Sequence, residues 1–192
     1  MQDRIRNISK ELLSANWYKL WKYTFEIQQK NGEWETQYRE AYDRGNGAAI
    51  LLYNKEKGTV ILTRQFRLPT YINGNTEGYM IEACAGLLDR DNPEEEIRRE
   101  TEEETGFRVL DVEKVMETYM SPGSVTEILH LFVAGYDENM RVTEGGGLAS
   151  EQENIEVLEL PFSKAFDMIR TREIRDAKTV LLLQHAKIAN LV

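Results

Sequence analysis

The sequence GLLDRDNPEEEIRRETEEETGF, residues 86–107, contains the most clearly predicted helix of the chain. Asn92 is a favourable N-cap and Pro93 suits the first helical position. The three glutamates that follow stand where the helix dipole favours negative charge. Gly106 is a favourable residue just past a helix end. We therefore predict a helix over residues 92–105.

The predicted helix gathers carboxylates on one face. Glu100, Glu103 and Glu104 stand at positions i, i+3 and i+4, and Glu96 joins them one turn earlier. Like charges at this spacing repel by roughly 0.2–0.5 kcal/mol per pair. A hard divalent cation such as Mg²⁺ would reverse that effect, because it prefers carboxylate oxygens. An adjacent stripe can pack inward: Ile97, Thr101 and Thr105.

The alternative is an ordinary solvated helix. Arg98 with Glu102, and Arg99 with Glu103, are i,i+4 pairs that would offset part of the repulsion. Charge spacing alone therefore leaves both interpretations open.

Strands and helices alternate along the rest of the chain. Alternating apolar and polar residues over 19–43 surround the Asn-Gly turn at 30–33, which predicts a β-hairpin. Further strands are expected at 48–53, 59–63, 79–83, 109–119, 128–136 and 155–160, and two helices at 163–171 and 176–189. This order predicts an α/β or α+β sandwich at residues 46–192, with a small separate sheet at 1–45.

Composition restricts the class of protein. The 33 acidic and 24 basic residues give a net charge of −9, which argues against nucleic-acid binding. A small phosphorylated substrate stays possible if cations neutralise it locally. The charged N-terminus does not resemble a signal peptide, and no apolar run reaches the ~20 residues of a membrane helix. Because Cys84 is the only cysteine, we expect a cytoplasmic protein without disulfides.

Residues 86–107 resemble the signature sequence of the Nudix hydrolases, the Nudix box. Arg99-Glu100, Glu103-Glu104 and Gly106-Phe107 match its second half. Two positions depart from the family pattern: Thr101 stands where an aliphatic residue is usual, and the interval from Gly86 to Arg99 is one residue short. The resemblance implies an α/β/α sandwich around a mixed sheet, with this helix at the active site.

The same resemblance implies a metal site. Glu100 and Glu104, with Glu103, would bind Mg²⁺ together with the backbone carbonyl of Ala85, and Arg99 would orient the glutamates. The Gly-rich loop 144–154 offers Glu153 as the first choice for the general base and a further metal ligand, and Glu151 as the second choice. We expect this loop to be flexible and able to close over a substrate.

Resemblance outside the box indicates the substrate class. Pro122, sixteen residues past Gly106, resembles the marker of the ADP-ribose pyrophosphatase-like subgroup, whose substrates are nucleotide-sugars. Segments along nearly the whole chain are similar to those of bacterial Nudix hydrolases that split GDP-mannose into GMP and mannose 1-phosphate. The implied substrate contacts are Trp17, Tyr38, Arg39, Glu40, Arg67, Gly86, Glu127 and Lys178.

The residues themselves are compatible with simpler roles. Arginines can pair with phosphate, but surface ion pairs are commoner, and Trp17 and Tyr38 are expected to pack within the N-terminal sheet. The high aromatic content of that sheet also fits a buried homodimer interface, which the subgroup resemblance implies. Two alternative functions stay open, namely hydrolysis of ADP-ribose or ADP-sugars and a Nudix module that binds nucleotide without cleaving it.

Overall fold

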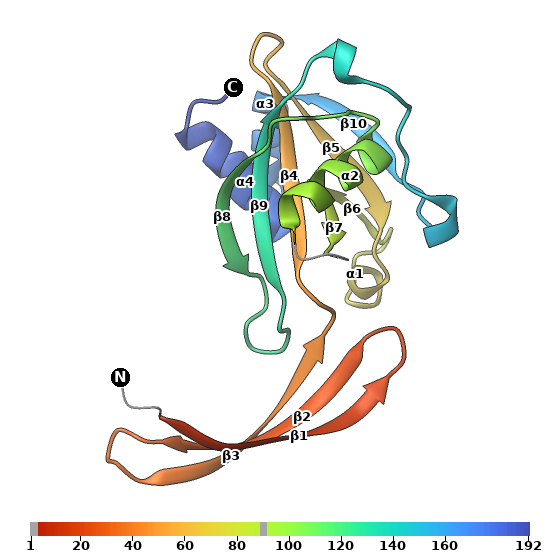
Figure 1. Cartoon of the computed structure of the whole chain (residues 1–192). Helices are drawn as coiled ribbons and strands as arrows, with labels where there is room; N and C mark the ends of the chain where they lie inside the picture. The colour runs from red at the N-terminus through yellow and green to blue at the C-terminus, as the bar shows by residue number, and fades with distance from the viewer. Residues whose placement is uncertain (1–3, 89–91) are drawn as a thin grey trace. The chain divides into compact units, whose positions relative to one another are not determined.

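The computed structural model describes residues 4–88 and 92–192, which fall into two compact units (Figure 1). The first unit contains Met1–Asn46 and Tyr119–Ile128, and the second contains Gly47–Thr118 and Leu129–Val192. The predicted division at residues 45 and 46 did not anticipate that 119–128 belongs with the first unit. Val125 forms a β-bridge with Tyr42, and the Tyr42 N–H donates to Ser124 O at 2.8 Å.

The first unit is built on a three-stranded antiparallel sheet in the order β1-β2-β3. Its strands are β1 (Ile5–Ala15), β2 (Lys19–Gln28) and β3 (Trp34–Asp43). The predicted hairpin is confirmed as β2 and β3, and Gly32 supplies the left-handed conformation of the turn, with φ +89°. Strand β1 was not predicted, because its sequence IRNISKELLSA lacks a two-residue alternation and its pairing contains two register shifts.

No residue that the structure describes in the first unit is buried. Strand β2 is half-buried along most of its length, and β1 is exposed almost throughout. Large apolar side chains such as Ile8 and Trp17 remain 64% and 80% exposed. This sheet therefore lacks the buried side chains that normally stabilise a three-stranded unit.

The second unit contains a seven-stranded mixed sheet. Five strands have the order β10-β5-β4-β9-β8, with β6 paired to β5 and β7 paired to β4. Strands β4 and β9 run parallel, and the pairs of β5 with β10, β4 and β6, and of β4 with β7, are antiparallel. The strands are β4 (Gly47–Asn54), β5 (Thr59–Phe66), β6 (Tyr79–Glu82), β7 (Cys84–Leu87), β8 (Glu113–Tyr119), β9 (Ile128–Gly135) and β10 (Glu156–Pro161). The helices are α1 (Leu68–Ile72), α2 (Pro93–Thr105), α3 (Phe162–Thr171) and α4 (Ala177–Ile188), with short 3-10 turns η1 (Glu138–Met140) and η2 (Ala149–Glu151).

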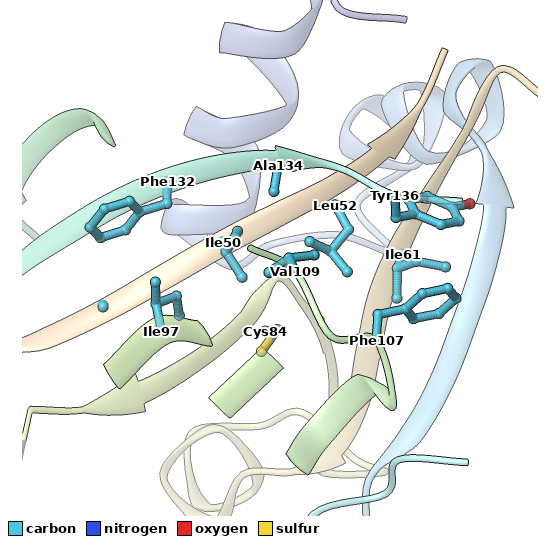
Figure 2. Close-up of a cluster of buried hydrophobic side chains, with 11 residues drawn as sticks. Ile50, Leu52, Ile61, Cys84, Ile97, Phe107, Val109, Phe132, Ala134 and Tyr136 are labelled. Carbon is cyan, nitrogen blue, oxygen red and sulfur yellow. The ribbon is translucent and has the colours of Figure 1, made fainter. Parts of the chain in front are cut away.

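Helices lie on both faces of the mixed sheet, with α2 in front and α4 behind in Figure 1. Alternate residues of β4, including Ile50 and Leu52, join a buried cluster with Ile97 of α2 and Phe132 of β9 (Figure 2). Leu183 of α4 is also fully buried. The predicted sandwich with a mixed sheet and a small N-terminal sheet is therefore confirmed. None of the described helices is long and apolar enough to span a membrane.

Helix α2 forms for the local reasons that the sequence indicated. The Asn92 side chain accepts the N–H groups of Glu94 and Glu95 at 3.2 and 3.4 Å, and Gly106 ends the helix in the left-handed conformation. Thr101, which departs from the Nudix pattern, is fully buried, and its hydroxyl donates to the Ile97 carbonyl at 2.5 Å. A threonine therefore fills the aliphatic position without leaving its polar atom unpaired.

Three elements of the second unit differ from those predicted. The strand expected at 109–119 begins only at Glu113, and the strand expected at 79–83 is β6, after which β7 at Cys84–Leu87 was not predicted. Helix α1 lies in a segment that was expected to be a loop. Short elements such as these carry too few residues to establish a periodicity.

Candidate active site

The glutamates of α2 lie against the strand that precedes the helix. Glu104 is 1% exposed, and its Oε2 accepts the Ala85 N–H of β7 at 3.3 Å. A Cβ at Gly86 would lie only 2.3 Å from the Glu100 carboxyl carbon. A side chain at position 86 would displace the Glu100 carboxylate, so the glycine lets Glu100 lie directly on the β7 backbone.

Arg99 connects three of the glutamates. Its Nε donates to Glu96 at 2.9 Å, its Nη1 to Glu103 at 2.5 Å and its Nη2 to Glu100 at 2.6 Å. Burial opposes the charge of Arg99, but the hydrogen bonds to Glu96 and Glu103 more than offset it and raise its pKa above the usual value. The expected pair of Arg99 with Glu103 is confirmed, and the guanidinium lies where it can hold the carboxylates in a fixed arrangement.

Two carboxylates are strongly perturbed. Burial, with repulsion from Glu103, Glu153 and Glu96, outweighs the attraction of Arg99 and raises the pKa of Glu100 to about 7. Burial, with repulsion from Glu100 and Glu153, raises the pKa of Glu104 to about 8. Perturbed acids that cluster in this way are typical of functional sites.

The donor set fits a hard divalent cation. Within residues 4–88 and 92–192, no group of three or more His, Cys, Asp or Glu side chains lies in an arrangement that could hold a metal ion as it stands. Even so, Glu100 and Glu104 bring two carboxylates to the Ala85-Gly86 backbone, and Glu100 contributes to the raised pKa of Glu104. Oxygen donors and accumulated negative charge are the features that Mg²⁺ and similar ions require. A bound cation would favour the ionised forms that burial now disfavours.

The glycines of the loop after η1 are docked on the end of α2. Gly146 and Gly147 donate their N–H groups to the carbonyls of Glu104 and Glu103 at 2.8 and 3.1 Å. A Cβ on Gly145 would lie 2.6 Å from the Glu104 carbonyl oxygen. The sequence predicted a flexible segment, but these glycines cap the helix, so this part of the loop is fixed to α2.

The side chain of Glu153 contacts the glycine-rich part of the same loop. Its Oε2 accepts the Leu148 N–H at 3.0 Å, and a Cβ on Gly147 would lie 2.4 Å from that oxygen. Its charge lies close enough to raise the pKa of both Glu100 and Glu104. The structure therefore brings the predicted first-choice base to the acidic cluster. The side chain of Glu151, the second choice, lies outside what the structure describes.

One predicted ion pair is wrong. Arg98 pairs with Glu94 and donates to the Leu110 carbonyl at 2.8 Å. Glu102 instead accepts two hydrogen bonds from Arg108, at 2.7 and 2.8 Å. The i,i+4 rule considers only the helix, whereas Arg108 reaches Glu102 from the segment beyond Gly106.

The second unit also brings Arg67 and Lys178 together. Both contact the carboxylate of Glu82, with Arg67 Nε and Lys178 Nζ each at 2.7 Å. Glu82 was missed by the sequence analysis. The only signal was one charged residue inside the apolar run YMIEACAG, residues 79–86.

The remaining candidates lie in the first unit and do not form one group there. Trp17 and Tyr38 are 80% and 59% exposed, so the interpretation that they pack within the sheet is wrong. Trp17 lines a hollow of about 290 Å³ formed by 15–19 and 43–45, whereas Tyr38, Arg39 and Glu40 lie further along β3. Glu127 lies 3.6 Å from Arg44.

Comparison with known proteins covers both units. Residues 4–42 match a family model described as the GDP-mannose pyrophosphatase NudK N-terminal domain, and residues 43–180 match the NUDIX domain. Three relatives are each named GDP-mannose pyrophosphatase. That of Yersinia enterocolitica is 56% identical over 192 residues, which is all of both chains. That of Pectobacterium atrosepticum is 59% identical over 97% of this chain and 95% of the relative, and that of Yersinia pestis is 54% identical over 98% and 94%.

Proposed function

Because the chain belongs to the NUDIX family, we propose that it hydrolyses the pyrophosphate bond of a nucleotide-sugar, and that GDP-mannose is the substrate, giving GMP and mannose 1-phosphate. The observation that carries this proposal is the pair Glu100 and Glu104, packed on the Ala85-Gly86 backbone with raised pKa values. The names of the full-length relatives support the choice of substrate.

The family's dependence on a divalent metal fits this cluster, and we propose Mg²⁺ as the ion. Glu100, Glu103, Glu104 and Glu153, with the Ala85 carbonyl, are the residues that would hold it. Bound there, the cation would neutralise developing charge on the phosphate oxygens and lower the pKa of the attacking water.

The protein's own groups would perform the remaining steps. Arg99 keeps Glu96, Glu100 and Glu103 in position through its three hydrogen-bonding nitrogens. Glu153 leaves the Leu148 N–H and accepts the proton of the attacking water, acting as the general base. Arg67, Lys178 and Gly86, which all belong to the second unit, contact the substrate, and Trp17, Tyr38, Arg39, Glu40 and Glu127 contribute from the first unit.

The test of this function is a panel of nucleotide-sugars with and without Mg²⁺. We expect GDP-mannose to be turned over fastest and activity to disappear in chelator, because hydrolysis needs a cation to neutralise the charge that develops on the phosphate oxygens. Product phosphate, released by a phosphatase, measures the rate. Equal or faster turnover of ADP-ribose would favour the ADP-sugar alternative. Tight nucleotide binding without any turnover would favour the non-catalytic module.

We also propose that the first unit forms a homodimer interface. Its sheet has no buried residue among those described, and several apolar side chains, such as Leu12 and Leu13 of β1, stay more than 40% exposed. A second copy would cover this surface. Each site could then include residues from both copies, which would account for the dispersal of the first-unit candidates.

The proposed dimer predicts that a single charge placed on the exposed sheet lowers the mass measured in solution. The wild-type protein should have about twice its 22.3 kDa chain mass in light scattering at micromolar concentration. Leu12→Glu, which puts a charge on the exposed sheet, should shift the mass towards one chain. Leu110→Glu is the matched control, because Leu110 is 74% exposed in the second unit. A monomeric wild type would rule out this interface.

A further inference from the structure

Glu82, at the end of β6, is a charged residue with a nearly inaccessible side chain. The side chain is only 6% exposed, and its two carboxylate oxygens accept from different cations. Oε2 accepts from Arg67 Nε and Oε1 from Lys178 Nζ, both at 2.7 Å. A buried carboxylate is costly unless it is paired, and Glu82 is paired twice.

The two cations come from distant parts of the chain. Arg67 follows β5, and Lys178 lies in the first turn of α4. Lys178 also lies 2.9 Å from Asp176, which accepts the N–H and hydroxyl of Thr179 at 3.0 and 2.6 Å. The Thr179 hydroxyl oxygen in turn accepts the Ala83 N–H at 2.6 Å. The network therefore joins α4 to the segment that leads into Ala85 and Gly86.

Glu82 and Lys178 are each held in the charged form by their partners. Burial alone would raise the pKa of Glu82, but Lys178 and Arg67 together hold it below its usual value. Burial alone would lower the pKa of Lys178, but Glu82 and Asp176 raise it above its usual value. The two cations can therefore stay close together only because a carboxylate lies between them.

Each cation keeps hydrogen-bonding capacity for a ligand. Arg67 uses only Nε within the part of the chain that the structure describes, and its side chain is 39% exposed. Its two terminal nitrogens are therefore available, and these are the atoms that pair with phosphate in a fork geometry. Lys178 has three N–H donors and uses two of them, on Glu82 and Asp176.

We propose that Glu82 is a positioning residue for the substrate: it holds Arg67 and Lys178 side by side so that their remaining N–H groups bind the phosphate oxygens together. This inference rests on the proposed function, which counts both cations among the substrate contacts. The competing interpretation is a purely structural ion pair, and buried ion pairs are weak evidence for either role. The two interpretations differ in what they predict for substrate affinity.

The test is Glu82→Gln, measured with GDP-mannose and saturating Mg²⁺. Glutamine keeps the volume but has one acceptor oxygen, so only one cation can remain in place. We expect KM to rise about 10- to 100-fold, as for loss of a charge-assisted contact, while kcat changes much less. Glu82→Asp keeps the charge and should recover part of the affinity. Tyr136→Phe is the control, because it removes a hydroxyl bonded to Thr59 and Glu159 in the same unit, and it should change stability without changing KM.

A double-mutant cycle separates positioning from stability. If Glu82 acts through Arg67, Glu82→Gln should have little further effect on KM once Arg67 is already alanine. Additive effects, or a KM for Glu82→Gln within twofold of wild type, would overturn the inference. Thermal unfolding of each variant, with Glu82→Asp as the milder change, identifies any loss of fold.

Calorimetry can measure the binding of GDP-mannose in chelator, where no hydrolysis is expected. It therefore tests the inference without depending on turnover. Weaker binding by Glu82→Gln than by wild type would support the positioning role even if wild type hydrolysed nothing, in which case only the proposed function would fail. Hydrolysis by wild type with unchanged binding and KM in the variant would remove the inference alone. Absence of both binding and hydrolysis in wild type would remove both.

Discussion

Glu104→Gln should lower turnover of GDP-mannose by at least about 100-fold, since even residues one shell away from a metal change its affinity or activity by 10- to 100-fold. Glu100→Gln should do the same. Both carboxylates lie against the Ala85-Gly86 backbone, and an amide cannot supply the negative charge that a divalent cation requires. Initial rates across a Mg²⁺ titration measure the loss.

The fold of Glu104→Gln should remain intact, and its stability should depend less on pH. The pKa of Glu104 is raised from an ordinary 4.5 to about 8 without metal, so the folded state favours the protonated form. This contribution to stability is fully present below about pH 4.5 and is lost as the pH rises through about 8. Thermal unfolding in chelator from pH 5 to 8 should therefore show a falling midpoint in wild type and a flatter one in the variant.

Glu102→Gln is the matched control for these substitutions. Glu102 belongs to the same helix but pairs with Arg108, away from Glu100 and Glu104. Its turnover should stay within about twofold of wild type, as for surface changes remote from a site. Unchanged turnover in both Glu100→Gln and Glu104→Gln would refute the proposed metal site.

Glu153→Gln should lower kcat by about 100- to 10,000-fold, the usual contribution of a general base. The Glu153 carboxylate lies near enough to Glu100 and Glu104 to raise the pKa of each, and its hydrogen bond to the Leu148 N–H keeps it on the loop. A proton acceptor in that place can act on water at the cluster. Single-turnover rates at saturating Mg²⁺ report this step directly.

Two further results define the role of Glu153. A shift of the Mg²⁺ dependence without a fall in the saturated rate would make it a metal ligand and not the base. A large loss of kcat in Glu151→Gln, with a near-normal kcat in Glu153→Gln, would identify Glu151 as the general base. Circular dichroism of both variants excludes unfolding as the cause.

Local chemistry explains why much of the site could be predicted. The limits of α2 follow from Asn92, whose side chain caps the first turn, and Gly106, which ends the helix in the left-handed conformation. The shared face of Glu100, Glu103 and Glu104 follows from the helix period alone. The strands of the mixed sheet were also recognisable, because β4 and β9 are continuous apolar runs.

The features that could not be predicted depend on contacts between distant residues. Glu82 meets Arg67 and Lys178, which lie 15 and 96 positions away, and no periodicity connects them. The return of residues 119–128 to the first unit is similar, since it depends on a bridge between Tyr42 and Val125. The glycines at 145–147 suggest flexibility by composition, and only the tertiary structure shows that Gly146 and Gly147 cap α2.

This cap restricts how the protein can be redesigned. An insertion within 145–147 would withdraw the N–H donors from the last carbonyls of α2 and move Glu153 away from the acidic cluster. Grafting a foreign loop to alter selectivity should therefore preserve the chain through Leu148 and keep Glu153, replacing only residues 149–152 between them. Variation in loop length would be tolerated only in that outer part, and a library built there could sample new substrates without losing the metal helix.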